Sequence, residues 1–238
     1  MVPPTNSRTA TRSSPKAAAS PALSREAVVD RALDVADREG IAAVSIRRIA
    51  QDFDVTPMAL YWHVKNKDEL LAAMGDRVLD VVEIAPPPAD GGLERLRPLL
   101  NNLVAALARH PGSTQLAQAR ILHSPPGQQL AEQALAILAD AGFDRQRRAD
   151  LSRAALQSVI MLVVGAPGAE IDVPEQDRQA MRDRKRAMLA GLPPGRFPQL
   201  VECADAMFEC DDPESYYANG IDLYLAGVFA MAARRTST

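Results

Sequence analysis

Apolar residues recur at helical spacing along most of this sequence, and no segment alternates between apolar and polar positions as a strand would. Ile46, Ile49, Ala50 and Phe53 follow the i, i+3, i+4, i+7 order of one helix face. Similar spacing continues to the end of the chain, so the pattern predicts an all-α protein. After the first four helices, further helices are expected at about residues 93–109, 112–121, 126–141, 145–166, 174–190, 197–208 and 213–234.

Capping residues predict a helix-turn-helix near the N-terminus. Ser45 is a typical N-cap for the second helix, and Thr56 with Pro57 is typical of an N-cap followed by the first helical position. About three residues separate these two helices, and a short helix after such a turn is the arrangement that enters the DNA major groove. Asn66 and Glu69 then form a capping pair that opens a longer fourth helix.

The predicted third helix carries the only tryptophan of a chain with four Tyr and five Phe. At about 100° per residue, its Pro57, Met58 and Tyr61 share one outward arc, where Met and Tyr suit thymine methyl groups and base edges. At the far end of the helix, three side chains suit DNA phosphates, namely Trp62, His63 and Lys67. The helix is therefore expected to read bases and to contact the DNA backbone.

Two simpler interpretations remain open for these residues. Tyr61 and Trp62 could pack the third helix against the fourth, with His63 as an ordinary hydrogen-bonded histidine. Arg47 and Arg48 on the second helix could form a solvated cationic face. The combination of caps, turn length, apolar stripe and cations favours DNA recognition over both.

Charge is distributed unevenly along the chain. Residues 1–67 hold ten Lys and Arg against seven Asp and Glu, a net of +3, while the whole chain carries −3. A polyanion is therefore expected to meet the N-terminal part. Residues 1–22, rich in Pro, Ser, Thr and Ala and without an acid, are expected to form a disordered basic arm. The other expected boundaries are 23–68 for a helix-turn-helix domain, 69–234 for a larger helical domain and 235–238 for a tail.

Several classes of protein are not expected. The apolar run "VIMLVVGA" at 159–166 is far shorter than the roughly 20 residues of a membrane span. The N-terminus lacks the apolar segment of a secretory signal, so a cytoplasmic location is expected.

Cys203 and Cys210, without a histidine cluster, predict neither a disulfide framework nor a zinc site. The sequence contains no nucleophile elbow, P-loop, HExxH motif or dinucleotide fingerprint, so no catalytic residue, cofactor or metal is expected, although His110 and His123 could in principle serve acid–base chemistry.

The segment "LSREAVVDRALDVADREGIAAVSIRRIAQDFDVTPMALYWHVKNKDELLAAM" resembles the DNA-binding domain of the tetracycline-repressor (TetR) family. Within it, "LYWHVKNK" is similar to the subgroup nearest the tetracycline repressor itself. The resemblance implies that four side chains face bases, namely Arg47, Pro57, Met58 and Tyr61. It implies that four others meet the DNA backbone, namely Ser45, Trp62, His63 and Lys67. Pro57 and Ala59 replace polar side chains of the tetracycline repressor, so its operator sequence does not transfer.

The predicted helix at 213–234 and the segment 154–165 of the predicted helix at 145–166 are apolar nearly all round, and such helices must be covered on both sides. Gly220 and Gly227 share one face and permit close approach of another helix. The family resemblance assigns the two helices to a four-helix dimer interface, with expected contacts at Leu156, Ile160, Val164, Gly220, Tyr224, Gly227 and Met231. Burial of both helices inside one monomer is the alternative.

Ten apolar residues, most of them on the helices before the predicted helix at 145–166, either line a small-molecule cavity or form a solid core. The residues concerned are Met74, Val78, Val82, Leu99, Leu103, Leu116, Ile121, Leu135, Leu138 and Met161. None of the histidines, His63, His110 and His123, stands at the helix 6 position where the tetracycline repressor's histidine serves its ligand-bound magnesium. A tetracycline–metal ligand is therefore not expected.

The expected architecture is a three-helix DNA-binding domain joined by the fourth helix to a larger ligand-binding and dimerisation domain. The expected function is a homodimeric transcriptional repressor that binds a palindromic double-stranded DNA operator and is released by a small-molecule effector. Release would follow from rotation of the fourth helix, because the two recognition helices must sit about 34–36 Å apart. An effector-independent DNA-organising or protein-interaction member of the same fold is the alternative.

Overall fold

The computed structural model describes residues 23–84, 92–171 and 173–236, and every regular element within these ranges is helical. The all-α prediction is confirmed. The expected arm at 1–22 and the last two residues of the expected tail lie outside the described residues. Within the described part of the chain, no helix is long and apolar enough to cross a membrane.

Fourteen helical elements follow one another along the described chain. The α-helices are α1 (Arg25–Glu39), α2 (Ile46–Asp52), α3 (Pro57–Leu60), α4 (Lys67–Asp80), α5 (Leu96–Arg109), α6 (Thr114–Arg120), α7 (Pro125–Asp140), α8 (Arg145–Val164), α9 (Glu175–Ala190), α10 (Pro198–Glu202) and α11 (Pro213–Thr236). The 3-10 turns are η1 (Ile41–Ala43), η2 (Gly92–Arg95) and η3 (Pro111–Ser113).

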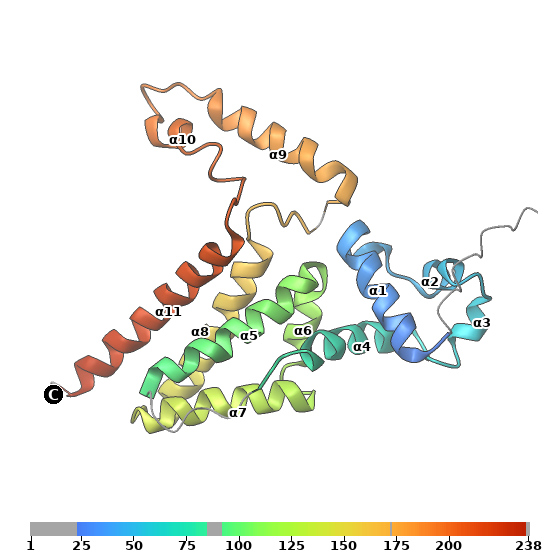
Figure 1. Cartoon of the computed structure of the whole chain (residues 1–238), viewed down its shortest axis with the longest axis horizontal. Helices are drawn as coiled ribbons and strands as arrows, with labels where there is room; N and C mark the ends of the chain where they lie inside the picture. The colour runs from blue at the N-terminus through green and yellow to red at the C-terminus, as the bar shows by residue number, and fades with distance from the viewer. Residues whose placement is uncertain (1–22, 85–91, 172, 237–238) are drawn as a thin grey trace, which may run out of the picture.

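The first three helices form a small unit at one end of the molecule (Figure 1). Ser24 caps α1 by accepting a hydrogen bond from the backbone N–H of Ala27 at 3.1 Å. Leu33 of α1, Ile49 of α2 and Leu60 of α3 are fully buried and join one core. The small unit therefore holds its short helices by apolar packing rather than by helix length.

Helix α4 leads from this unit into a larger body made of α5, α6, α7, α8 and α11 (Figure 1). It packs against α1 on one side and α6 on the other. Within the body, α5 lies against α8 and α11, and α7 lies against α8. Because α4 belongs to both parts, a shift of α4 relative to α6 must move the N-terminal unit relative to the body.

Helices α9 and α10 project from the body as an arm (Figure 1), and neither helix contains a buried side chain. The expected helix at 197–208 is wrong in extent, because α10 ends at Glu202 and the next residues form separate turns. A short helix is marginal in water unless packing stabilises it. Since α10 buries nothing within this chain, packing does not extend it.

Candidate DNA-binding surface and ligand cavity

The turn between α2 and α3 is set by local hydrogen bonds. Ser45 caps α2 by accepting from the N–H of Arg48 at 3.2 Å. After α2, Asp54 takes a left-handed conformation with φ of 54°, which a short polar side chain tolerates better than most. The N–H of Val55 then donates to the carbonyl of Ala50 at 3.0 Å, which closes the turn. Helix α3 is thereby fixed in direction only a few residues after α2.

The recognition segment, defined as residues 57–64, has one buried side and one exposed side. Leu60 and Val64 are fully buried, whereas Met58 is 68% exposed, Tyr61 45% and Trp62 89%. The α-helix itself ends at Leu60, and the N–H groups of His63 and Val64 continue the turn by donating to its carbonyl at 2.8 and 3.0 Å. The exposed side therefore presents three large side chains to solvent.

The exposure of Trp62 bears on the alternative in which the aromatic residues anchor the third helix to α4. A side chain with that much of its surface in water makes little packing contact, so Trp62 does not anchor α3. His63 is half-buried and gives its backbone carbonyl to a hydrogen bond from Arg25 at 3.1 Å. Pro57 is exposed at the first helical position, and Thr56 caps α3 without a side-chain hydrogen bond.

Arg25 and Glu69 join the end of the recognition segment to the start of α4. The Arg25 guanidinium donates to Oε1 of Glu69 at 2.8 Å, while Oε2 of Glu69 accepts from the N–H of Lys65 at 2.9 Å. The hydrogen bond from Arg25 is the main reason that the pKa of Glu69 lies below its ordinary value. Asn66 caps α4 through the N–H of Glu69 at 2.8 Å, but Glu69 reaches back to Lys65 rather than to Asn66. The expected capping pair therefore differs in one hydrogen bond: the Glu69 side chain accepts from the N–H of Lys65 instead of that of Asn66.

The cations near the recognition segment fall into two groups. Arg48 is bound by the carboxylates of Glu39 and Asp52, and the hydrogen bond to Glu39 is the main cause of its raised pKa. Arg47 and Lys67 are exposed, and no hydrogen bond or ion pair of their side chains is recorded among the described residues. Arg47 and Lys67 are therefore available to a phosphate or a base, while Arg48 serves the internal ion-pair network.

A cavity of about 280 Å³, partly open to solvent, lies in the larger body between α5, α7, α8 and the residues that follow α6. Most of its wall is aliphatic, with Leu99, Leu100 and Leu103 from α5 and Ile121 and Leu122 just after α6. Helices α7 and α8 supply the rest, namely Leu130, Ala131, Ala134, Leu135, Ala149, Ser152, Arg153, Ala155 and Leu156. The cavity suits an apolar molecule because only two lining side chains are polar.

Four of the residues expected to line a cavity do so, namely Leu99, Leu103, Ile121 and Leu135. Met74, Val78, Val82 and Leu138 are buried in the core instead. Leu116 packs against the core beside α4, and Met161 is exposed beside an open groove between α6 and α8. Helical periodicity identifies apolar faces but does not say which face borders empty space.

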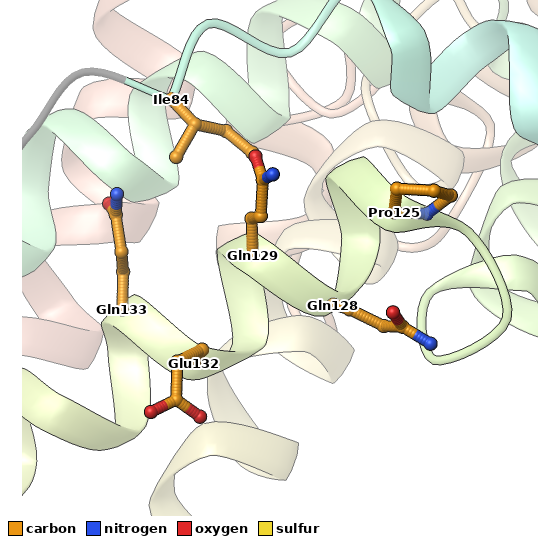
Figure 2. A pocket seen from close by; sticks show the side chains of 6 residues that line it. All are labelled: Ile84, Pro125, Gln128, Gln129, Glu132 and Gln133. Carbon is orange, nitrogen blue, oxygen red and sulfur yellow. The ribbon is translucent and has the colours of Figure 1, made fainter.

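A second hollow, of about 600 Å³, lies at the surface between α7 and the segment that follows α4. Figure 2 shows Gln129 and Gln133 of α7 directed toward Ile84, while Glu132 points away. Four of its six lining residues carry polar side chains, and it is open to solvent, with Gln128 and Pro125 at the start of α7. It lacks the enclosed apolar wall of a typical small-molecule site.

The N-terminal unit meets the body at two places, and a glycine permits close approach at each. At the first, a Cβ on Gly75 of α4 would lie 2.6 Å from the backbone oxygen of Leu116 of α6. Next to it, Arg120 donates from Nε to Oδ1 of Asp76 at 2.7 Å and from Nη2 to Oδ2 at 3.2 Å. This two-pronged pair ties α4 to the end of α6, one residue before the cavity residue Ile121.

The second junction is formed by Asp37 near the end of α1. Its Oδ2 lies 2.7 Å from Nδ1 of His110, and its Oδ1 accepts from the N–H of Gly112 at 3.2 Å. Its backbone carbonyl accepts from the guanidinium of Arg178 in α9. A Cβ on Gly112 would lie 2.7 Å from the carbonyl oxygen of Ala36, so glycine is required for this close contact. The orientation of the N-terminal unit is therefore set through both α1 and α4.

Two family models together match most of the chain. Residues 28–74 match the model of bacterial regulatory proteins of the tetR family, and residues 85–232 match the tetracyclin repressor-like C-terminal domain. The second match alone covers more than half of the 238 residues. The chain belongs to the TetR family. It is accordingly a DNA-binding transcription regulator and not an enzyme.

Individual known proteins are similar to this chain over most of its length. The transcriptional repressor DrrR1 of Streptomyces coeruleorubidus is 27% identical over 90% of this chain and 80% of its own length. The structure of ActR of Streptomyces coelicolor with actinorhodin is 26% identical, with a TM-score of 0.63 over 88% of this chain and 98% of that chain. The structure of BioQ with its double-stranded DNA operator is 26% identical, with a TM-score of 0.52 over 77% of this chain and 99% of that chain.

In this TetR-family chain, several residues expected at a dimer interface pack within the chain. Tyr224 donates to the backbone carbonyl of Leu151 at 2.8 Å, and burial raises the pKa of Tyr224 to about 12. Gly220 lies under Leu162 of α8, whose Cδ2 would be 2.2 Å from an added Cβ. Leu156 borders the cavity, and Ile160 and Val164 line the groove between α6 and α8.

The remaining expected dimer residues lie on an exposed face of α11. Gly227 has open space where a Cβ would point, and Met231 is exposed. Leu223, 79% exposed, lies on the same side one turn earlier. This α11 face, defined as Leu223, Ala226, Gly227, Ala230 and Met231, is apolar and exposed in the single chain.

Several functional side chains were not found from the sequence of this TetR-family member. Asp37, Asp76 and Arg120 join the two domains, and each looks like an ordinary charge on the polar side of a helix. Gly75 and Gly112 carry the clearest available signal, because glycine inside or next to a helix often marks close approach. Among the described residues, no group of three His, Cys, Asp or Glu is placed to hold a metal ion.

Proposed function

We propose that this protein is a homodimeric repressor that binds a palindromic operator and is released by a small molecule held in the cavity between α5 and α8. The observation that carries the DNA-binding part is the exposed side of the recognition segment. Met58, Tyr61 and Trp62 face solvent from a segment fixed by the burial of Leu60 and Val64. Three large side chains exposed to water are energetically unfavourable unless a partner covers them. The DNA major groove offers such a partner.

The base-reading role falls to Met58 and Tyr61, with Pro57 and Arg47 beside them. Trp62, His63, Lys67 and Ser45 serve as contacts to the DNA backbone, which fix orientation and register but do not specify sequence. Arg47 and Lys67 support this division because neither is engaged by a recorded ion pair in the described chain. Repression is supported by the similarity to DrrR1.

The homodimer is supported by the α11 face. One side of α11 packs on α5 and α8 and buries Ile221, Leu225 and Val228, while the α11 face remains open. An apolar helix side of this kind is stable in water only when another surface covers it. A second copy related by a two-fold axis would cover it with the same face and place two recognition segments for the two halves of a palindrome.

Release by a ligand is supported by the path from the cavity to α4. Ile121 and Leu122 line the cavity and directly follow Arg120, whose guanidinium holds Asp76 of α4. A ligand that displaces the end of α6 therefore moves α4, because Gly75 leaves no free space between the two helices. The similarity to ActR, solved with actinorhodin, supports an effector for this chain. The effector-independent alternative leaves the aliphatic cavity without a role.

The test begins with selection of duplexes from a random library by the full-length protein. Enrichment of a two-fold symmetric sequence, bound by two chains, is the expected result. Binding of one chain to a single half-site, or equal binding of all sequences, would contradict the dimeric repressor. For any ligand found, linkage requires that saturating operator weaken ligand binding by the same factor that the ligand weakens operator binding. Equal ligand affinity with and without operator would exclude ligand release.

A further inference from the structure

The cavity between α5, α7, α8 and the residues that follow α6 has a wall that limits the chemistry of its occupant. We propose that its ligand is an elongated aliphatic carboxylic acid of about ten carbon-sized atoms, bound without a metal, with the chain inside and the carboxylate beside Arg153 at the rim. The inference rests on the proposed ligand-released function and adds the chemical class of the ligand.

The wall favours an aliphatic chain. Twelve of its fourteen residues are Leu, Ile or Ala, and no aromatic ring lines it. A flat polycyclic ligand would find no ring to stack on and only two polar side chains, Ser152 and Arg153, for its oxygen atoms. A polar ligand would leave its groups without hydrogen-bond partners, which is costly away from water. Methylene groups need no partner and gain free energy from the same wall.

The volume limits the length of the chain. A cavity of about 280 Å³ lies just below the range of roughly 300–1,000 Å³ for drug-sized ligands. At about 30 Å³ for a water-sized group, it holds roughly nine such groups. A saturated chain of about ten carbons therefore fills the cavity when its polar end remains outside. Longer chains must leave their last carbons in water.

Arg153 supplies the only charge among the lining residues. It stands one turn after Ala149 and next to Ser152, so the three line the cavity along one side of α8. Its recorded partner, Asp150, is 3.6 Å away, and both side chains are largely exposed, so the guanidinium is only loosely engaged. A guanidinium binds a carboxylate with two parallel hydrogen bonds, and Ser152 adds a hydroxyl donor.

A metal-dependent ligand does not fit this wall. A ligand-bound divalent cation needs oxygen or imidazole donors, and the fourteen lining residues include no Asp, Glu, His or Cys. Arg153 at the rim would repel a cation as well. A free carboxylate matches both features, because it needs no metal and pairs with Arg153.

The first experiment measures the affinity of the full-length protein for saturated carboxylates from hexanoate to tetradecanoate, below their critical micelle concentrations. Each methylene group is expected to strengthen binding about fourfold, from about 0.8 kcal/mol per buried group, until about decanoate. Beyond that length the gain per carbon should stop. Affinity that rises without a break to tetradecanoate, or that does not depend on chain length, overturns the proposed chain inside the cavity.

The second experiment separates the contribution of the ligand's carboxylate from that of its hydrocarbon chain. Decanoate is expected to bind about two- to fivefold more tightly than decanol, as exposed charge pairs usually contribute, and the difference should shrink in high salt. Arg153→Gln should remove that difference, whereas Arg145→Gln, on the same helix but outside the wall, should keep it. Equal binding of decanoate and decanol by the wild type overturns the role of Arg153. Tighter binding of magnesium–tetracycline than of decanoate overturns the metal-free assignment.

A third experiment tests whether the hydrocarbon chain of the ligand lies in the cavity. Ala131→Leu adds about three carbon atoms to the wall, so the longest carboxylate that still gains affinity should become about three carbons shorter. Ala136→Leu is the matched control, because Ala136 lies on the exposed side of α7 and does not line the cavity. An unchanged chain-length limit in Ala131→Leu overturns the assignment of the cavity. Operator binding is measured on the same preparations: intact operator binding without any carboxylate binding overturns this ligand class alone, whereas loss of specific operator binding overturns the proposed function itself.

Discussion

Nδ1 of His110, at the end of α5, lies 2.7 Å from Oδ2 of Asp37, at the end of α1. The two residues are far apart in sequence and belong to different domains, so their contact fixes one domain against the other. The other carboxylate oxygen of Asp37 accepts from Gly112, and its carbonyl accepts from Arg178. One residue of the DNA-binding unit thus meets the end of α5, the η3 turn and the α9 arm.

Asp37→Ala should therefore loosen the DNA-binding unit. The change removes two hydrogen bonds to a carboxylate, each typically contributing a net of about 1.5–3 kcal/mol to stability, and less where both side chains are partly exposed, as Asp37 and His110 are. We expect the free energy of unfolding, measured by urea denaturation, to fall by about 1–3 kcal/mol, and operator affinity to fall as well. Asp34→Ala, one turn earlier on the exposed side of α1, should change both by much less. Equal effects of the two variants would contradict the role of Asp37.

Gly75→Ala should disturb the junction between α4 and α6. The new Cβ would lie 2.6 Å from the backbone oxygen of Leu116 and 2.8 Å from Cγ of Arg120, so the helices must separate. Overpacking of this kind usually costs about 1–3 kcal/mol, which a thermal melt would report as a lower Tm. Gly195→Ala is the control, because the space around Gly195 is open and its φ is not left-handed. A Tm for Gly75→Ala equal to that of the wild type would show that the junction is not tightly packed.

Tyr61→Ala and Lys67→Ala should weaken DNA binding in different ways. Loss of a base contact at Tyr61 should cost about 1–3 kcal/mol on the selected operator and blur sequence preference, whereas loss of a phosphate contact at Lys67 should weaken binding on all sequences. Lys67→Ala should also reduce the slope of log affinity against log salt by about one unit. Fluorescence anisotropy on operator and scrambled duplexes distinguishes the two. An equal loss on both duplexes for Tyr61→Ala would exclude base reading by this residue.

Acid should destabilise the contact between Arg25 and Glu69. The hydrogen bond from Arg25 lowers the pKa of Glu69 in the folded protein below its ordinary value of 4.5. The ion pair therefore contributes stability above about pH 4.5, and this contribution is lost as the pH falls through the lowered pKa. Glu69→Gln should lower the Tm at pH 7 and reduce the dependence of the Tm on pH below 4.5. A parallel pH profile for the two proteins would count against the contact.

Tyr224 should be the last tyrosine to ionise. Burial raises its pKa from 10.0 to about 12. Its contribution to the free energy of unfolding is therefore fully present below pH 10 and is lost as the pH rises through about 12. Ultraviolet absorbance at increasing pH should show one late phenolate that Tyr224→Phe removes. The same substitution deletes the hydrogen bond to Leu151 and should lower the free energy of unfolding by about 0.5–1.5 kcal/mol. Tyr217→Phe, which has no such recorded bond, should retain the late phenolate.

The fold was largely predictable because its determinants are local. Ser24, Ser45 and Asn66 cap their helices through side-chain oxygen atoms, and Pro57 opens α3 as its fixed φ favours. Leu60 and Val64 are buried on the side of the recognition segment opposite the expected outward arc of Pro57, Met58 and Tyr61, which agrees with helical spacing. These properties depend on neighbours within about one turn, which the sequence contains in order.

The cavity and the domain junctions were less predictable because they depend on distant residues. Met74 and Leu103 have the same apolar character and similar spacing, yet Met74 is core and Leu103 borders empty space. Arg153 had no distinguishing neighbour in sequence, and its position at the rim comes from the packing of α8 against α5 and α7. The expected helix at 197–208 was wrong in extent for a related reason: its pattern is helical throughout, but α10 buries none of its side chains and ends at Glu202.

Because Trp62 is nearly completely exposed, the intrinsic tryptophan fluorescence of the protein reports on the recognition segment. Trp62 is the only tryptophan in the chain, and it stands on the recognition segment of the N-terminal unit, whereas the cavity residues belong to the larger body. Emission excited near the indole absorption edge therefore reports one location rather than an average over the molecule. Binding of duplex DNA should change that emission by removing water from a single ring. Occupation of the cavity alone should leave it nearly constant, so the two binding events can be followed separately in one unlabelled sample.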